Sequence, residues 1–259
     1  MRVAAVIPAR YASTRFPAKP LAAQTGQPLI QHVYERARQV PGIDCVIVAT
    51  DDARIIEAVR RFGGQAVMTR ADHPSGTDRV AEVAANLTQD LIVNLQGDEP
   101  EIEPAHIERL VRRLTANRDA PIATLACPFA VVDGADPRDP HIVKVVLDTA
   151  SRAIYFSRAP IPHPRLHETT GRLHQPAPYL LHLGVYAYRR DVLLGLSKLE
   201  PTPLERTEKL EQLRWIEHGY AITVEVVDSA APGIDTPEDY AAFVQRHQSP
   251  SHNAQSAGP

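Results

Sequence analysis

The feature that most constrains the fold is an alternation of short apolar segments with longer amphipathic ones over the first half of the chain. Apolar runs of strand length occur at residues 3–7, 45–49, 65–68, 91–95 and 122–127. Between them, apolar residues recur at helical spacing in residues 30–40, 52–62, 77–87 and 104–117. Right-handed crossovers place helices on the faces of a parallel sheet, so continuously apolar strands indicate a sheet covered on both faces. We therefore expect an α/β fold with a Rossmann-like, mostly parallel sheet and helices on both faces.

The second half of the chain has a mixed pattern. It predicts a hairpin formed by residues 142–147 and 153–157, and further strands at residues 180–188 and 222–227. Two helices are predicted, at residues 204–218 and 236–246. A proline- and histidine-rich loop covers residues 158–178. We expect one domain over residues 1–246, a β-rich insertion after about residue 130 that extends to about residue 190, and a disordered tail at residues 247–259.

Composition excludes several classes of function. Charged residues make up 23% of the chain and hydrophobic residues 44%, which is the balance of a globular protein with a sizeable core. The formal net charge of -3 provides no positive field for nucleic acid or an anionic membrane. No apolar run approaches the roughly 18 residues of a membrane span, so we expect a cytoplasmic protein that binds a small molecule. Cys45 and Cys127 lie in apolar segments and are expected to be buried thiols.

The loop directly after the first expected strand carries three cations. Arg10, Arg15 and Lys19 lie within ten residues of one another, at the carboxyl end of a strand, where α/β sheets bind ligands. A triphosphate could neutralise them through forked arginine contacts and a lysine point charge. The alternative is a solvated basic loop, because neither of the usual glycine-rich phosphate motifs is present.

Two acidic segments far apart in the sequence are candidate metal ligands. Asp98 follows the expected strand at residues 91–95 and stands beside Gly97, whose missing side chain allows close approach. Asp235 precedes the expected last helix. Each has a plainer explanation: a turn or capping role for Asp98, and stabilisation of the helix N-terminus for Asp235. Glu99 is expected to cap or to be solvated. If both loops lie at one edge of the sheet, the two aspartates can hold one Mg²⁺.

Four ordered blocks stand out along the chain: IPARYASTRFPAKPL at 7–21, TRADHPSGTDR at 69–79, VNLQGDEP at 93–100 and GIDTPED at 233–239. Together they resemble the successive motifs of the 3-deoxy-manno-octulosonate cytidylyltransferase (CMP-Kdo synthetase) family, and residues 143–148, 155–158 and 182–186 are similar to its later blocks. The resemblance covers nearly all of residues 3–246. It implies a nucleotidyltransferase-type fold and a reaction of CTP with Kdo, an acidic eight-carbon sugar of lipopolysaccharide, to give CMP-Kdo and pyrophosphate. It also implies Mg²⁺ as cofactor and a homodimer built around the segment after residue 130.

The resemblance assigns roles to individual residues. It implies that Arg10, Arg15 and Lys19 hold the triphosphate and that Asp98 and Asp235 hold Mg²⁺. The cytidine would contact Pro8, Ala9, Arg10, Ser13, Ser75, Gly76 and Gln96. The sugar would contact Arg79, Gln96, Arg158, His182, Tyr186, Glu211 and Gln212. Plainer alternatives remain open for some of these: a helix-entry turn for Ser75 and Gly76, a satisfied core residue for His182, and a solvated helix surface for Glu211 and Gln212.

Two positions depart from the family's usual pattern. Ala18 stands where a glycine usually precedes the lysine, and Asp78 stands where glutamate is more usual. A left-handed turn at Ala18 would be strained, so we expect slightly altered loop mobility or CTP affinity. Other functions compatible with the sequence are a cytidylyltransferase for amino-Kdo or a sialate, a metal-dependent glycosyltransferase, and a nucleotide-binding module without activity. A glycosyltransferase of this kind is expected to carry a D-x-D motif after a strand of the sheet, and Asp98-Glu99 does not match that motif.

Overall fold

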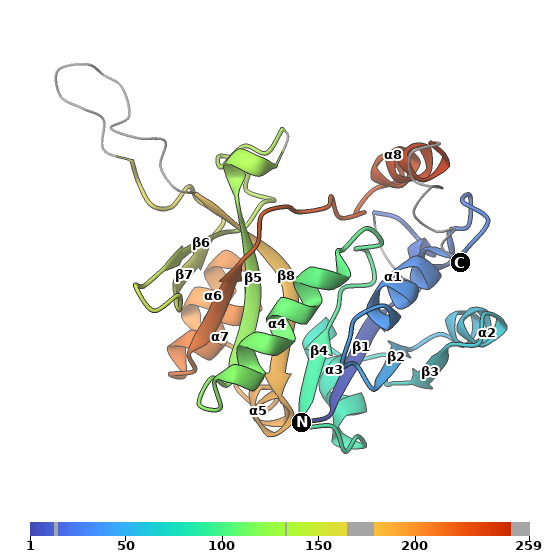
Figure 1. The fold of residues 1–259 in the computed structure, drawn as a ribbon, viewed down its shortest axis with the longest axis horizontal. Helices are drawn as coiled ribbons and strands as arrows, with labels where there is room; N and C mark the ends of the chain where they lie inside the picture. The colour runs from blue at the N-terminus through green and yellow to red at the C-terminus, as the bar shows by residue number, and fades with distance from the viewer. Residues whose placement is uncertain (13–14, 133, 165–178, 250–259) are drawn as a thin grey trace. The chain divides into compact units, whose positions relative to one another are not determined.

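A computed structural model describes residues 1–12, 15–132, 134–164 and 179–249 of the chain (Figure 1). The chain divides into two compact units. The first consists of Met1–Ile107 and Ala231–Pro259, and the second of Glu108–Ala230. The single domain expected over residues 1–246 stays a prediction, and so does the disordered tail, most of which lies outside the described residues.

The first unit holds a parallel sheet in the order β3-β2-β1-β4. Its strands are β1 (Val3–Ala9), β2 (Cys45–Thr50), β3 (Gln65–Met68) and β4 (Leu91–Asn94). They alternate with the helices η1 (Lys19–Leu21), α1 (Leu29–Arg38), α2 (Ala53–Arg61) and α3 (Gly76–Ala85), and α8 (Pro237–Gln248) returns to this unit from the end of the chain (Figure 1). β1 and β4 are apolar and buried along nearly their whole length, as expected for central parallel strands.

The second unit mixes parallel and antiparallel pairs. β5 (Ile122–Pro128) pairs antiparallel with β8 (Leu180–Arg189) and parallel with β9 (Ile222–Val226). β6 (Lys144–Leu147) pairs antiparallel with β7 (Ala153–Ser157) and with β8. The remaining helices are α4 (Pro104–Ala116), which begins in the first unit, η2 (Phe129–Val131), α5 (Arg190–Leu196), α6 (Pro203–Glu208) and α7 (Glu211–Glu217).

The α/β class with a mostly parallel central sheet is confirmed, and so is the hairpin of β6 and β7. The β-rich insertion after residue 130 stays a prediction. One helix prediction is wrong: residues 204–218 form two helices, α6 and α7, because Lys209 adopts a left-handed conformation with φ of 55° and ends the first. The sequence analysis also missed α5.

The helix ends follow the capping signals of the sequence. The Asp52 side chain accepts a hydrogen bond from the backbone N–H of Arg54 at the start of α2. Thr236 caps α8 in a capping box with Asp239, and Pro237 is the first helical residue. Cys45 and Cys127 are both free thiols, as expected, although only Cys127 is fully buried.

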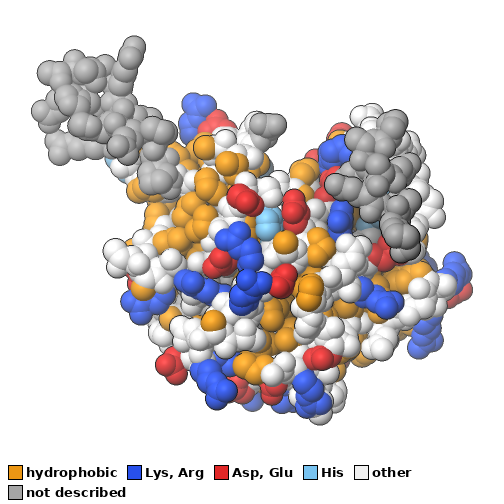
Figure 2. Space-filling view, in the orientation of Figure 1, with side chains coloured by type: hydrophobic (Ala, Val, Ile, Leu, Met, Phe, Trp, Pro, Cys, Tyr) orange, Lys and Arg blue, Asp and Glu red, His pale blue; other side chains and the backbone are white. Residues whose placement is uncertain are grey.

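Within the described residues, every helix is too short or too polar to cross a membrane. Figure 2 shows basic and acidic side chains interspersed over the visible face. This mixture agrees with the small net charge of the chain.

Candidate functional site

The candidate site lies where two neighbouring strands of the first unit end. β1 and β4 are parallel and in register, with Val6 opposite Asn94, so the loops that follow them leave the same edge of the sheet. Gly97 passes the end of β1 so closely that a Cβ there would lie 3.0 Å from the Pro8 carbonyl oxygen. A side chain at this position would push the two loops apart. The glycine therefore permits contact between the loops themselves.

A backbone contact brings the second acidic segment to the first. The Ile234 N–H donates to the Asp98 carbonyl oxygen at 2.9 Å, which places Asp235 beside the β4 loop. Ile234 is buried in an apolar cluster with Leu29 of α1 and with Tyr240 and Phe243 of α8. This packing fixes the start of α8, and with it the position of Asp235, by burial of apolar surface.

The two aspartates converge on one ammonium group. Lys19 Nζ lies 2.9 Å from Asp98 Oδ2 and 3.9 Å from Asp235 Oδ1, and it donates to the Ile234 carbonyl oxygen at 2.6 Å. Arg15 forms a two-pronged contact with Asp235, with both N–O distances at 3.1 Å. Lys19 is largely buried, with 14% of its side chain exposed, whereas Arg15 and Asp235 are more than half exposed. The expected convergence of distant carboxylates beside a cation loop is thus present.

These contacts distinguish between the alternatives for the loop and for Asp235. Lys19 is not a solvated surface charge, because it is engaged on three sides. Asp235 does not cap α8, since Thr236 and Asp239 satisfy the helix N-terminus. Its carboxylate is directed to Arg15 and Lys19 instead. Ala18, just before Lys19, has φ of 58°, which is the left-handed turn anticipated for this position.

Glu99 differs from the expectation of a capping or solvated residue. It is half-buried, and burial, followed by the nearby negative charge of Asp98, raises the pKa of its carboxyl to about 8. The partial burial of Glu99 could not be predicted from its position in the sequence, because burial of a loop carboxyl depends on packing.

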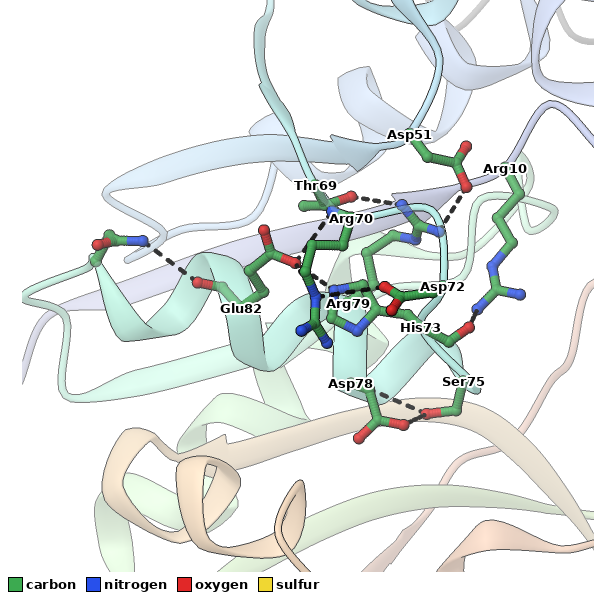
Figure 3. Close-up of polar contacts among 11 residues, drawn as sticks. Arg10, Asp51, Thr69, Arg70, Asp72, His73, Ser75, Asp78, Arg79 and Glu82 are labelled. Atoms are coloured by element: carbon green, nitrogen blue, oxygen red, sulfur yellow. Dashed lines mark hydrogen bonds and ion pairs between the residues drawn. The ribbon is translucent and has the colours of Figure 1, made fainter.

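Arg10 belongs to a second set of polar contacts, shown in Figure 3. Its guanidinium donates to the His73 carbonyl oxygen at 2.6 Å, and the buried His73 ring contacts Glu82 of α3. Ser75 caps α3, accepting from the Asp78 N–H at 3.1 Å and donating to the Asp78 carboxylate at 2.7 Å. The loop that would contact the nucleotide is thereby fastened to α3, and the helix-entry role considered for Ser75 is present.

A further acidic pair at this sheet edge was missed by the sequence analysis. Asp51 and Asp52 follow β2 just as Asp98 and Glu99 follow β4. Asp51 accepts from Arg79 at 2.7 Å, and Arg79, with no exposed surface, also donates to Thr69 (Figure 3). Asp52 pairs with Arg54. Both carboxylates of this pair are thus neutralised by arginines of the scaffold. The position of the pair at a strand end was the signal that could have identified it.

The residues expected to contact the sugar are divided between the units, and their roles stay predictions. Arg79 is in the first unit, in the buried contacts just described. Arg158 donates to the carbonyl oxygens of Glu208 and Pro140, both at 2.8 Å. His182 bonds to the Thr124 hydroxyl at 3.0 Å, and burial lowers the pKa of its ring to about 3. These contacts match the satisfied core histidine considered as an alternative for His182.

The other expected sugar contacts lie close together in the second unit. Tyr186 is buried, with its ring 5.4 Å from the His182 ring and 5.2 Å from that of Trp215 in α7. Glu211 and Gln212 are the first residues of α7, where Glu211 pairs with Arg214 at 3.3 Å. Gln212 is buried, so the solvated surface considered for it is absent.

The remaining nucleotide-binding predictions concern the ends of β1 and β4. Pro8 and Ala9 are the last residues of β1, and Gln96 is in the turn after β4. A Cβ at Gly76 would lie 3.5 Å from Pro8 Cγ, an ordinary contact, so the β1 end and the start of α3 are adjacent. Ser13 lies outside the described residues.

The chemistry of the donor set fits a divalent cation that is shared with a ligand. Among the described residues, no group of three or more His, Cys, Asp and Glu side chains could hold a metal ion by itself. Asp98 and Asp235 supply two carboxylates that both lie within 4 Å of the Lys19 ammonium. Mg²⁺ is commonly bound by one or two carboxylates plus substrate phosphates, and it keeps several waters.

Comparison with known proteins identifies the family. The sequence profile described as "Cytidylyltransferase" matches residues 4–224. The chain is 53% identical over 241 residues to the 3-deoxy-manno-octulosonate cytidylyltransferase of Syntrophotalea carbinolica, covering 92% of this chain and 96% of that protein. The chain belongs to the 3-deoxy-manno-octulosonate cytidylyltransferase family.

Two further relatives of this family agree. The Escherichia coli 3-deoxy-manno-octulosonate cytidylyltransferase is 49% identical over 232 residues, which cover 90% of each chain. A solved structure of CMP:2-keto-3-deoxy-manno-octonic acid synthetase complexed with CTP is 45% identical, with a TM-score of 0.88, and the match covers 99% of this chain and 100% of that one. The resemblance identified from the sequence blocks is therefore confirmed.

Proposed function

We propose that the protein transfers the cytidylyl group of CTP to Kdo, giving CMP-Kdo and pyrophosphate for lipopolysaccharide biosynthesis. The observation that carries the proposal is the convergence of Asp98 and Asp235 on Lys19, beside Arg15. A nucleoside triphosphate with a divalent cation has the complementary charges, namely phosphate oxygens for the basic residues and a metal ion for the carboxylates. Relatives that are about half identical over almost the whole chain are named for this reaction.

In the proposed reaction the anomeric hydroxyl of Kdo attacks the α-phosphorus of CTP. A new phosphorus–oxygen bond forms while the bond to the β-phosphate breaks, and negative charge grows on the departing pyrophosphate. Lys19, Arg15 and Arg10 bind the phosphates and neutralise that charge. The remaining task of the site is to hold the two substrates in line, so no covalent intermediate on the enzyme is needed.

Mg²⁺ is the cofactor we propose, with Asp98 and Asp235 as its protein ligands. When bound, it would supply charge stabilisation on the phosphates. Asp98 and Asp235 contribute by holding their carboxylates at the edge of the sheet. Lys19 contributes by neutralising them until the substrate arrives.

The binding surfaces follow from the position of the loops. Pro8, Ala9, Ser75, Gly76 and Gln96 are proposed to contact the cytidine, where the ends of β1 and β4 and the start of α3 meet. Ser13 completes this set from the sequence alone. The proposed contacts of the sugar are Arg79, Gln96, Arg158, His182, Tyr186, Glu211 and Gln212.

The test is pyrophosphate release by the purified protein with CTP and Mg²⁺, in separate reactions with Kdo, amino-Kdo and a sialate. We expect release with Kdo that exceeds release with the other sugars, and none without a sugar. Release only with amino-Kdo or the sialate would transfer the assignment to that acceptor. CTP binding without release in any reaction would indicate a nucleotide-binding module.

Two further properties are proposed from the family resemblance. We expect a homodimer, which light scattering after size-exclusion chromatography would detect as twice the mass of the chain. We also expect a cytoplasmic location, because the reaction consumes CTP. Fractionation of cells that express the tagged protein would test this.

A further inference from the structure

An arginine of α2 lies on an aromatic ring of the cation loop. The guanidinium carbon of Arg54 is 3.4 Å from the centroid of the Tyr11 ring. Tyr11 directly follows Arg10 in the loop that leaves β1, whereas Arg54 is in the first turn of α2. A guanidinium stacked on a tyrosine ring is attracted by the negative face of the ring and by dispersion.

Arg54 is held in this position by the cap of its own helix. Asp52 accepts from the Arg54 backbone N–H at 2.8 Å, from Nε at 2.9 Å and from one terminal nitrogen at 2.6 Å. These hydrogen bonds lower the pKa of the Asp52 carboxyl. A guanidinium with a forked carboxylate partner loses little further freedom when it stacks. The Arg54 guanidinium is therefore already oriented for stacking on the Tyr11 ring of the loop.

The position of Tyr11 affects both ends of the cation loop. Its carbonyl oxygen accepts from the Ala18 N–H at 3.0 Å, which joins Tyr11 to the residue before Lys19. Arg10 precedes this contact in the chain, and Lys19 follows it. A shift of Tyr11 thus displaces the guanidinium and the ammonium that are proposed to bind the triphosphate.

We infer that Arg54 is a positioning residue for nucleotide binding, which holds the cation loop in a triphosphate-ready arrangement through its stacking on Tyr11. The inference rests on the proposed function, because it assigns the triphosphate to that loop. Arg54 does not touch the reacting atoms. Its effect is to reduce the ordering that the loop undergoes when CTP binds, so it acts on affinity for CTP and not on the chemical step.

The kinetic test compares Arg54→Ala and Arg54→Lys with Arg61→Ala. Arg61 is a matched control, because it is an exposed arginine of the same helix and pairs with Glu57 instead of the loop. For Arg54→Ala we expect KM for CTP to rise about two- to fivefold, with kcat changed less than about twofold and KM for Kdo unchanged. Arg54→Lys retains a cation over the ring and should recover part of the loss. Arg61→Ala should match the unaltered protein.

A second measurement requires no activity. Trypsin cleaves after Arg15, and this bond should be cut faster in Arg54→Ala than in Arg61→Ala or the unaltered protein. CTP and Mg²⁺ should slow the cleavage in all three proteins. Tyr11→Phe keeps the ring and should behave like the unaltered protein, whereas Tyr11→Leu should reproduce Arg54→Ala. Calorimetric titration with CTP and Mg²⁺ in the absence of sugar should show the same order of affinities.

The outcomes separate the inference from the proposed function. Unchanged KM for CTP and unchanged cleavage in Arg54→Ala would overturn the positioning role, and so would a loss confined to kcat. If even the unaltered protein released no pyrophosphate with Kdo, the proposed function would fail, while cleavage and CTP titration would still decide the role of Arg54.

Discussion

The two units of the molecule use charged residues in different ways. In the first unit, Lys19 pairs with aspartates from two other loops, and these carboxylates are a third to a half exposed. In the second unit, Lys144 has no exposed surface and donates to the backbone carbonyl oxygens of Asp139, Ile142 and Arg158 at 2.9, 2.5 and 2.5 Å. Burial, as the largest cause, lowers the pKa of Lys144.

This difference indicates which charges are available for a ligand. Partly exposed ion pairs contribute little to stability, so their members can exchange partners at small cost. A buried ammonium that satisfies several carbonyl groups cannot be removed without leaving those groups unpaired. We therefore expect substitutions at the first kind of site to affect turnover, and substitutions at the second kind to affect folding.

The largest effect is expected for the acidic pair. Asp98→Asn or Asp235→Asn keeps the shape of the side chain but removes a metal-binding charge, so kcat should fall on the order of 100- to 1,000-fold. Circular dichroism and the urea midpoint should remain those of the unaltered protein. Near-normal turnover of either variant would remove that residue from the proposed metal site.

The next prediction compares two lysines by the same substitution. Lys144→Met should lower the free energy of unfolding by about 2–4 kcal/mol, because the three carbonyl oxygens that bond to this buried ammonium lose their donor. Lys19→Met should lower it by less, because the carboxylates that lose their partner are partly exposed, and should raise KM for CTP. Urea denaturation and initial rates measure the two effects. Equal destabilisation by both substitutions would contradict the distinction between the units.

A third prediction concerns acid stability. Burial, and then the positive charges of His247 and Arg36, lowers the pKa of His32 to about 4. An unfolded histidine has a pKa of about 6.5, so the unfolded state binds protons that the folded state does not take up. The stability associated with the neutral His32 is therefore fully present above about pH 6.5, and it is lost as the pH falls toward 4.

His32→Gln should remove part of that acid sensitivity. Between pH 7.5 and pH 4.5, we expect the unaltered protein to lose about 2 kcal/mol more unfolding free energy than the variant. Urea denaturation at several pH values measures it. His182, with its pKa at about 3, should add a similar loss in the second unit. Parallel pH curves for the two proteins would contradict the assignment to His32.

The smallest effect is expected from glycine substitutions at residues with a left-handed backbone conformation. Ala18→Gly removes the steric cost of φ at 58°, offset in part by the greater freedom of glycine, so stability should rise by up to about 1 kcal/mol. Ser151, with φ of 59°, is the matched position in the second unit. Ser151→Gly should give a similar gain, but only Ala18→Gly should change KM for CTP.

The sequence predicted the first unit more accurately than the second, for physical reasons. Buried parallel strands are apolar throughout, and caps such as Asp52 and Thr236 mark the helices between them, so the expected elements agree within about two residues. In the second unit the break between α6 and α7 falls on Lys209. A left-handed lysine has no sequence signature of the kind that glycine would give.

The site was predictable in part. The position of Asp98 at a strand end, together with the family resemblance, predicted that it would meet Asp235. The contact that joins them, from the Ile234 N–H to the Asp98 carbonyl oxygen, depends on the packing of α8 and could not be inferred from spacing. The same is true of the pairing of Asp51, whose partner Arg79 follows only after β3 and the start of α3.

The three-sided engagement of Lys19 has a consequence for the order of events. Together with the Arg15 guanidinium, its ammonium serves as an internal counter-ion to Asp98 and Asp235. When a nucleotide arrives together with its cation, Lys19 can pass from carboxylate to phosphate oxygens while the aspartates acquire a replacement positive charge. Such an exchange of partners leaves no unpaired charge at this partly buried site, so we expect the cation and the nucleotide to bind together.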